Sequence, residues 1–307
     1  MAIDYGNDLV LLTCASGKQC SHLLPLLYGK CKRLRLVVNS TSSEERLKEH
    51  YPQADVTRAN LMDFNETKRI MKGVTTVFHI GPSFHPHETE IGYFMVDAAA
   101  EEVKNGNLQH FIYSSVLNTQ LRKMMNHDCK RYVEEYLMES GLNYTILQPT
   151  HFMDLFPVPM LMQQEDPVYT ANWDPTIPFS FIALKDLAEA AAIILKEREK
   201  HYLAQYPMVS TSPTTYADFA KIVGKEVGKD IKLEQRSYMD AVSALLKVLH
   251  GTDDVHPTSR DTAQRMLLFY NYRGLVGNSN VLGWILGRKP TTIEEWARIK
   301  TKSASAL

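Results

Sequence analysis

A short turn at residues 13–20, TCASGKQC, lies between an apolar strand-length run and an amphipathic helical pattern, and its residue types suit the binding of a phosphate. A helix N-terminus offers free backbone N–H groups and a partial positive charge to such a ligand. The usual dinucleotide-binding turn spaces three glycines, for the bend, for close approach of the backbone and for helix packing. At that spacing this chain has Cys14, Gly17 and Cys20. The turn predicts a diphosphate site, although a turn that binds nothing would also keep small residues.

Histidines are the next candidates for chemistry. His151 follows Pro149 and Thr150 at the end of a strand-like run, where a group that titrates near neutral pH could donate a proton to a ligand. A histidine that orders the loop by hydrogen bonding is the alternative.

Three further histidines lie close together in FHIGPSFHPHE, namely His79, His85 and His87. Pro82 and Pro86 interrupt the segment, and no cysteine or carboxylate pair completes a ligand set with the histidines. We therefore expect no metal site.

The four cysteines, Cys14, Cys20, Cys31 and Cys129, lack metal-ligand spacing and fit the reduced thiols of a cytosolic protein. A helix N-terminus can lower the pKa of a thiol, so a redox switch at Cys14 and Cys20 is one hypothesis. Small apolar packing residues are the simpler interpretation.

The elements that position these residues alternate between strand and helix. Apolar runs at 8–13, 33–39, 54–61, 75–81, 109–116 and 143–149 alternate with helical patterns at 19–30, 42–50, 63–73, 90–106 and 124–141. This order predicts an α/β protein with a Rossmann-like, doubly wound parallel sheet. We expect residues 1–150 to form this domain and residues 151–307 a smaller C-terminal substrate lobe, with a strand and helix at 178–197 returning to the first domain. Ligands of such sheets bind beyond the carboxyl ends of the strands.

Composition excludes several classes of protein. Of 307 residues, 44% are hydrophobic, and 34 Lys and Arg balance 35 Asp and Glu, which argues against a nucleic-acid or anionic-membrane surface. No apolar run approaches the ~20 residues that a membrane span needs. The first residues, MAIDYGNDLV, lack the apolar core of a secretory signal, so we expect a cytoplasmic protein whose partner is a small-molecule metabolite.

Several motifs together resemble those of the NmrA-like family, atypical members of the short-chain dehydrogenase/reductase superfamily. The family opens with a strand and T-G-A-T-G-x-x-G, which corresponds to residues 13–20 here. GKQCSH at 17–22 is similar to the G-K-x-A-S-H of fungal members. The segments 72–84, 110–116, 129–154 and 177–192 also resemble family landmarks, so the resemblance covers nearly the whole chain.

The resemblance implies NADP(H) as the cofactor and assigns residues to it. They are Thr13, Ser16, Gly17, Lys18 and Gln19 in the turn, Asn39, Ser40 and Thr41 after the second strand, Asn60 after the third, Ile80, Gly81 and Pro82 after the fourth, and Lys130 and Pro149.

Two departures from the family weaken these contacts. The family usually has a basic residue just after the second strand, for the 2′-phosphate of NADP, whereas NSTSS follows that strand here. No acidic residue stands there either, which argues against NAD. Arg46 and Arg35 are the candidates for reaching the phosphate. After the third strand Ala59-Asn60 replaces the family's Gly-Asp.

The resemblance also points to catalytic positions. Asn126 and Lys130 match the superfamily's Tyr-x-x-x-Lys and, four residues apart, share a helix face. Asn cannot act as a general acid, so we assign Lys130 to cofactor and substrate positioning. Ser115, beside Ser114, matches the catalytic-serine region and could hold a substrate oxygen, so the proton would come from His151, Ser115 or a water.

The leading hypothesis is therefore an NADP(H)-dependent oxidoreductase of secondary metabolism that acts on a small apolar or aromatic metabolite. The first alternative is a cofactor-independent isomerase, cyclase or lyase. It is favoured by Cys14, Asn60 and the uncharged NSTS loop, which weaken the expected contacts to a dinucleotide. The second is an NADP-sensing regulatory protein, which the missing tyrosine favours.

Overall fold

The computed structural model describes residues 2–305, which separate into two compact units. Unit 1 contains the residues up to Gln120 together with His127–Gln148 and Leu187–Tyr206. Unit 2 contains Leu121–Asn126, Pro149–Asp186 and the residues from Pro207 onward. Each unit is described here by itself.

A seven-stranded sheet organises unit 1, in the order β11-β6-β5-β4-β1-β2-β3. Its strands are β1 (Leu9–Leu12), β2 (Arg33–Val38), β3 (Asp55–Arg58), β4 (Thr76–Ile80), β5 (His110–Ser114), β6 (Tyr144–Pro149) and β11 (Ala204–Met208). The pairs β1–β2, β2–β3, β1–β4, β4–β5 and β5–β6 are all parallel. The strand order reverses between β1 and β4, and such a switch point is where open α/β sheets bind ligands.

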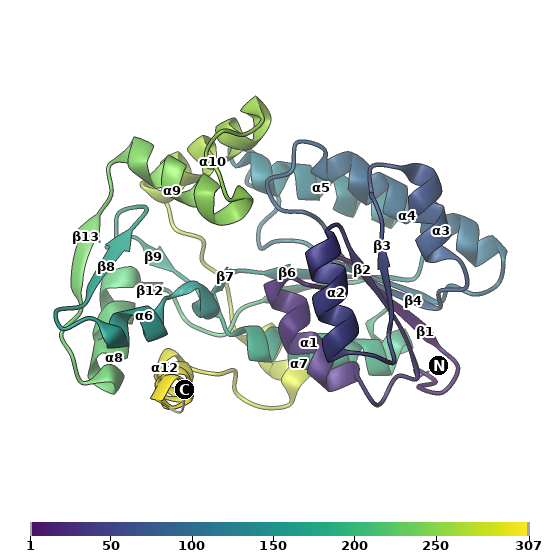
Figure 1. The fold of residues 1–307 in the computed structure, drawn as a ribbon, viewed down its shortest axis with the longest axis horizontal. Coiled ribbons are helices and arrows are strands. Elements are labelled where there is room, and N and C mark those ends of the chain that lie inside the picture. The colour runs from purple at the N-terminus through teal and green to yellow at the C-terminus, as the bar shows by residue number, and fades with distance from the viewer. Residues whose placement is uncertain (1, 306–307) are drawn as a thin grey trace. The chain divides into compact units, whose positions relative to one another are not determined.

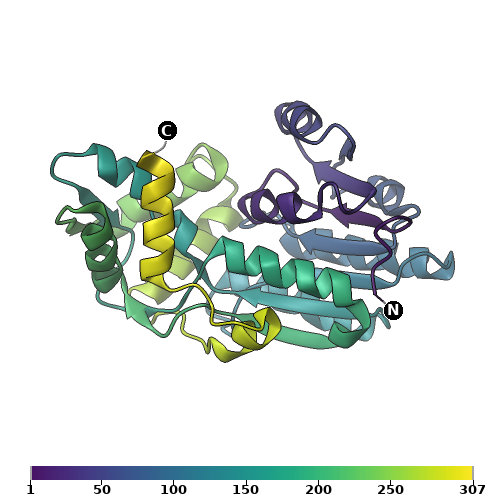
Figure 2. The ribbon, with the colours of Figure 1, turned by 90° about the horizontal axis from the view of Figure 1, so that it is seen from below.

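Helices cover both faces of this sheet (Figure 1). They are α1 (Lys18–Leu27), α2 (Thr41–His50), α3 (Phe64–Met71), α4 (Glu88–Lys104), α5 (Met125–Glu139) and α7 (Leu184–Glu197), followed by the 3₁₀ turn η2 (Arg198–His201). The helices α3, α4 and α5 lie on one face, and Figure 2 looks onto the other face, which α1 and α7 cover. This arrangement confirms the predicted Rossmann-like α/β fold.

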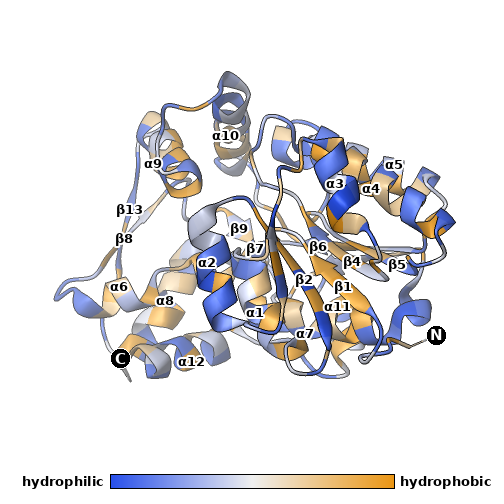
Figure 3. Ribbon diagram, turned by 45° about the vertical axis from the view of Figure 1, so that its right-hand side comes forward, coloured by the Kyte–Doolittle hydropathy of each residue, from blue (hydrophilic) through white to orange (hydrophobic). Residues whose placement is uncertain are grey.

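The central strands of the sheet are buried on both faces, whereas the outer strands β3 and β11 are largely polar or partly exposed. All four residues of β1 are buried, and β1 and β2 are among the most hydrophobic parts of the ribbon (Figure 3). Close packing between helices adds to this core. A Cβ built on Gly92 of α4 would lie 2.3 Å from Cγ2 of Val133 on α5, so only glycine allows these helices to approach so closely.

Unit 2 contains short strands and most of the later helices. Its elements are β7 (His151–Phe152), η1 (Met153–Leu155), α6 (Val158–Gln163), β8 (Val168–Ala171), β9 (Pro178–Phe179), β10 (Phe181–Ile182), β12 (Thr214–Thr215), α8 (Tyr216–Val227), β13 (Lys232–Gln235), α9 (Tyr238–His250), α10 (Pro257–Tyr270), α11 (Asn280–Leu286) and α12 (Ile293–Ser305). Strand β7 pairs with β10, β9 with β12 and β8 with β13. Helix α12 packs against α6 and α8, and α10 packs against α9.

A buried carboxylate fastens the late segments of unit 2. Asp186 is fully buried and accepts hydrogen bonds from the backbone N–H of Thr291 at 2.6 Å, the Thr291 hydroxyl at 2.8 Å and Ser210 Oγ at 3.1 Å. Arg288 completes its environment with an ion pair of 2.8 Å. Because a buried carboxylate needs such partners, Asp186 fixes the chain around Thr291.

No helix among residues 2–305 is both long and apolar enough to cross a membrane.

Candidate functional site

The turn after β1 keeps the path of a glycine-rich turn although it has lost a glycine. Cys14 has φ of +48°, in the left-handed region that an L-residue rarely adopts. The bend that a glycine normally provides is therefore present, with a thiol in place of a hydrogen atom. The surrounding structure must hold Cys14 in this conformation, since it costs about 1–2 kcal/mol.

Gly17 stands at the start of helix α1. It is the N-cap residue, its φ of −79° is ordinary, and its N–H donates to the Cys14 carbonyl at 2.8 Å. A Cβ at this position would lie 3.0 Å from that same carbonyl oxygen. Within the described chain, α1 has no side-chain cap and no acidic residue in its first turn. Its first N–H groups can therefore receive an anion.

Thr13 and Gln19, two other residues predicted for the turn, form hydrogen bonds with the ends of neighbouring strands. The Thr13 hydroxyl accepts a hydrogen bond from the N–H of Ile80 at 2.9 Å and donates to the Ile80 carbonyl at 3.0 Å. It also lies 2.9 Å from Nδ1 of His79. Thr13 thus joins β1 to β4, so its hydroxyl serves the fold. Gln19 accepts a hydrogen bond of 2.7 Å from Ser114, at the end of β5.

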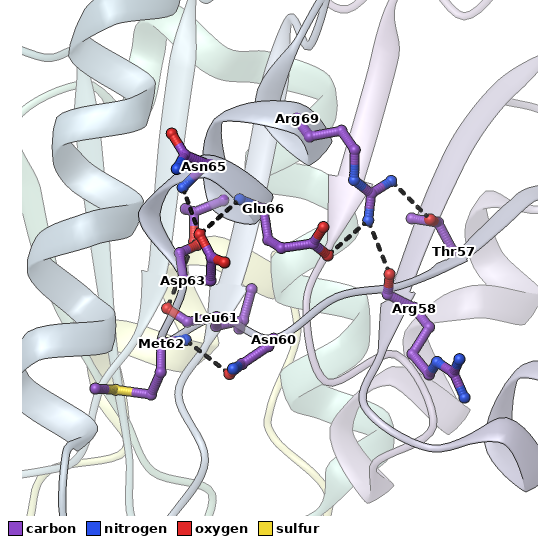
Figure 4. Close-up of polar contacts among 10 residues, drawn as sticks. Thr57, Arg58, Asn60, Leu61, Met62, Asp63, Asn65, Glu66 and Arg69 are labelled. Carbon is purple, nitrogen blue, oxygen red and sulfur yellow. Dashed lines mark hydrogen bonds and ion pairs between the residues drawn. The ribbon is translucent and has the colours of Figure 1, made fainter.

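The ends of β2 and β3 carry the residues predicted for the adenosine half of a dinucleotide. Ser40 caps α2 by accepting from the N–H of Ser43 at 3.3 Å, and Thr41 accepts a hydrogen bond from the Arg58 guanidinium. Asn39 is exposed. Asn60 Oδ1 accepts from the N–H of Met62 at 3.0 Å, which orders the loop after β3 (Figure 4).

The two arginines proposed for the 2′-phosphate behave differently. Arg35 pairs with Asp55 at 2.7 Å and donates to the carbonyls of Ile70 and Lys72 at 2.8 and 2.9 Å. These partners hold Arg35 at the start of β3 and the end of α3, away from the carboxyl end of β2. Arg46 is exposed, one turn into α2.

Lys130 forms a buried ion pair that its sequence pattern did not predict. Its ammonium contacts the carboxylate of Glu88, the first residue of α4, and the side chains are 9% and 2% exposed. Burial alone would lower the pKa of Lys130, but the attraction of Glu88 raises it above its usual value. A Cβ on Gly81 would lie 3.4 Å from Glu88 Oε1, so the pair adjoins the loop after β4. Since a buried lysine needs a counter-charge, the inward-facing lysine was itself a signal that an acidic partner exists.

A second buried carboxylate lies near Ser115. Glu134 accepts hydrogen bonds from Thr119 at 2.9 Å and from Gln148 at 3.0 Å. Burial raises the pKa of Glu134, and the side chains of Ser115, Gln148 and Thr119 offset part of this rise. Ser115 is buried, and its N–H donates to the Leu147 carbonyl at 2.8 Å. Sequence reasoning missed Glu134, because an acidic residue on a helix is normally exposed.

His151 belongs to unit 2 and lies among aromatic rings. Its ring stacks on Phe179 with centroids 4.5 Å apart and meets Tyr270 edge-on at 4.9 Å. His151 Nδ1 lies 3.3 Å from the hydroxyl of Tyr216. Trp173 lies in the same cluster, and its Nε1 is buried with no hydrogen-bond partner in the described structure. Phe179, Tyr216 and Tyr270 are buried, so these rings pack against one another in the core of unit 2.

The remaining predicted site residues are divided between the two units. Asn126 is assigned to unit 2, where its amide contacts the sulfur of Met266 at 3.5 Å, and Pro149 also belongs to that unit. Ser16 and Lys18 stay in the turn of unit 1, the first half-buried and the second exposed. The structure thus brings together the β1 turn, the β4 loop, Ser114 and Lys130, whereas His151 lies among residues of unit 2.

Histidine and cysteine surroundings do not favour metal or redox chemistry. His79 is buried, which lowers its pKa to about 3, and the described residues include no group of three potential metal ligands. All four cysteines are free thiols. Burial raises the pKa of Cys14 to about 11 and that of Cys20 further, so the helix N-terminus does not activate either thiol.

Comparison with known structures defines the class of fold. The chain is similar to the triphenylmethane reductase of Citrobacter sp. complexed with NADP(H), with 18% identity and a TM-score of 0.74 over 95% of this chain and 99% of that one. It is also similar to the Escherichia coli NADPH-dependent quinone oxidoreductase QOR2 complexed with NADPH, with 19% identity and a TM-score of 0.72 over 95% and 99%.

A third similar structure is that of a transcriptional regulator. NmrA, a negative transcriptional regulator in complex with NAD, shares 17% identity and a TM-score of 0.73 over 98% of each chain. At these identities the likeness defines the fold alone. The search of curated proteins found no match. Residues 6–297 match the NmrA-like family, and the chain belongs to that family.

Proposed function

We propose that the protein binds NADP(H) at the switch point between β1 and β4 and is an oxidoreductase for a small apolar or aromatic metabolite, in secondary metabolism. The observation that carries the proposal is the left-handed conformation of Cys14. It preserves the bend of a phosphate-binding turn where the sequence had lost the glycine. The NADP(H) complexes among the similar structures support the same cofactor.

The residues of unit 1 would bind the diphosphate and the adenosine half of the dinucleotide. The N–H groups at the start of α1 would hold the diphosphate, and the bare Cα of Gly17 leaves room for its approach. The loop Ile80–Pro82 would line the adenosine and ribose, and residues 39–41 would meet the adenosine ribose. When bound, the cofactor supplies a hydride, and the protein contributes orientation and the exclusion of water.

The proton would come from His151, Ser115 or a water, and of the two side chains Ser115 belongs to the same unit as the cofactor site. The His151 ring already contacts the Tyr216 hydroxyl at 3.3 Å, and this pair could pass a proton within an otherwise aromatic cluster. Lys130 would position cofactor and substrate, and its ion pair with Glu88 would hold its side chain beside the β4 loop.

A dinucleotide-sensing regulatory protein is the second candidate. Two observations favour it. Asn126 occupies the position of the tyrosine that donates the proton in the superfamily's Tyr-x-x-x-Lys pattern. The charge of the Lys130 ammonium is already neutralised by Glu88. Both features remove parts of the usual reductase apparatus without removing the dinucleotide site.

A titration separates these proposals. NADPH and NADH are titrated into the full chain while nicotinamide fluorescence is followed, and the loaded protein is then offered enones, imines, quinones and triarylmethane dyes. Binding with oxidation of NADPH by one of these classes supports the oxidoreductase. Binding without turnover of any of them supports the regulator. If neither nucleotide binds, both proposals are wrong and a cofactor-independent enzyme is the remaining hypothesis.

A further inference from the structure

The β2–α2 loop poses a problem for an NADP site. Asn39, Ser40 and Thr41 offer hydroxyl and amide groups, but the loop carries no positive charge. A 2′-phosphate is a dianion and is bound most strongly by a charged donor. The similar structures do not decide the matter, since they include complexes with both NADP(H) and NAD.

Arg58 brings a positive charge to this loop from the neighbouring strand. It is the last residue of β3 and pairs in register with Val38, the last residue of β2. The N–H of Ala59 donates to the Val38 carbonyl at 3.1 Å, which fixes the two strand ends side by side. The Arg58 side chain then reaches the β2–α2 loop, where Nη1 donates to the Thr41 hydroxyl.

No carboxylate of the described residues forms a direct ion pair with Arg58, although Arg58 attracts Glu44 at longer range. Over residues 2–305 its side chain has the hydroxyl of Thr41 as its hydrogen-bond partner and forms no ion pair. Glu44 of α2 is paired with Lys48 at 2.7 Å, and the charge of Arg58 also helps to lower the pKa of Glu44. Arg58 is exposed, so its guanidinium can reorient toward an arriving ligand.

The neighbouring arginine supports Arg58 and does not compete with it. Arg69 of α3 donates to the backbone carbonyl of Arg58 at 2.9 Å and pairs with Glu66 at 3.0 Å (Figure 4). These bonds neutralise Arg69 and hold the end of β3 in place. Arg58 is therefore the cation at this edge whose charge remains available, on a backbone that is fixed.

We propose that Arg58 binds the 2′-phosphate of NADP(H) and thereby makes the site prefer NADP(H) to NAD(H), in place of a basic residue after β2. This inference rests on the proposed cofactor site. The planar guanidinium can bind two phosphate oxygens at once, which the uncharged loop cannot do. The hydroxyl of Thr41 steadies the guanidinium beside the ribose position.

The test compares Arg58→Gln with Arg46→Gln, which removes an exposed arginine from the adjacent helix. Affinities for NADPH and NADH are measured by nicotinamide fluorescence, and adenosine 2′-monophosphate and 5′-monophosphate serve as competitors. We expect Arg58→Gln to weaken NADPH binding ~10- to 100-fold, the range for loss of a charge-assisted contact. NADH affinity should stay within about twofold of the wild type. Arg46→Gln should change neither, and Arg58→Lys should restore part of the NADPH affinity.

The outcomes distinguish the inference from the function on which it rests. If wild-type protein binds neither nucleotide, the cofactor proposal fails. If wild-type protein prefers NADPH and Arg58→Gln keeps that preference, the assignment of Arg58 is wrong. Loss of preference in Arg46→Gln instead would transfer the role to Arg46. Unchanged NADH binding and far-UV circular dichroism show that the Arg58 variant is folded.

Discussion

The Lys130–Glu88 ion pair makes a quantitative prediction about the stability of unit 1. Both side chains are almost fully excluded from water, at 9% and 2% exposure. Removing one partner leaves the other charge buried without compensation. Lys130→Met or Glu88→Leu should therefore lower the free energy of unfolding by ~3–5 kcal/mol. The double variant, which replaces both charges by apolar groups, should be close to the wild type or more stable.

Urea unfolding followed by far-UV circular dichroism measures this cycle. With a urea dependence of about 3 kcal/mol per molar, each single variant should lower the midpoint by about 1–2 M. Lys48→Met is the matched control, because it breaks a Lys–Glu pair of 2.7 Å whose lysine is 56% exposed. That change should cost less than about 0.5 kcal/mol.

The reasoning depends on the pair being desolvated. If each single variant cost less than about 1 kcal/mol, the pair would behave like a surface contact and the argument from burial would be refuted. If the double variant lost the sum of the two single effects, the two charges would not be coupled. Either result would also weaken the view that the ion pair holds the Lys130 side chain beside the β4 loop.

Three further predictions follow from particular residues. His79 and His110 are buried, which lowers each pKa to about 3, and burial lowers that of His127 to about 4. Unfolded histidines take up protons below about pH 6.5, so in this range the unfolded state binds more protons than the folded state. As the pH is lowered from 6.5 to 4, the free energy of unfolding should therefore fall, by up to about 4 kcal/mol per pH unit for the three histidines together. Urea midpoints at successive pH values check this. His127→Gln should reduce the pH dependence of the free energy of unfolding by the contribution of one proton, about 1.4 kcal/mol per pH unit. Gly17→Ala should lower the free energy of unfolding by about 1–2 kcal/mol, because alanine is a poor N-cap and its Cβ would lie 3.0 Å from the Cys14 carbonyl oxygen, and should weaken NADPH binding at least ~10-fold because the turn must shift to relieve this contact; an unchanged NADPH affinity would contradict this. Cys14→Val should unfold more easily than Cys14→Gly by at least ~1 kcal/mol, because a β-branched side chain resists positive φ, and equal melting curves would show that the bend carries no strain.

The alternation of strands and helices was sufficient to predict the parallel sheet. β1 and β6 are fully buried strands within the predicted apolar runs, whereas β3 (Asp55–Arg58) is shorter than the predicted 54–61 and begins and ends with charged residues. The resemblance likewise indicated the NmrA-like family, which the match over residues 6–297 confirms. The assignments of individual cofactor and catalytic residues stay predictions.

Contacts between distant side chains could not be predicted in the same way. Lys130 and Glu88 are 42 positions apart, and nothing in the local pattern of either residue identifies the other. Arg58 was missed for a related reason. It is the last residue of β3 but is proposed to act at the end of β2, a relation that exists only once the strands pair in register. Arg35 shows the converse. Its position on β2 suggested that it could reach the 2′-phosphate, but its ion pair with Asp55 holds its side chain at the start of β3.

The conformation of Cys14 also has a consequence for how such turns diverge. Cysteine and glycine codons differ by a single base, so one mutation exchanges the two residues at this bend. Because the backbone already follows the left-handed path with cysteine present, the exchange in either direction requires no rearrangement of the loop. A lineage could thus lose and regain the glycine signature while the shape that faces the ligand stays the same.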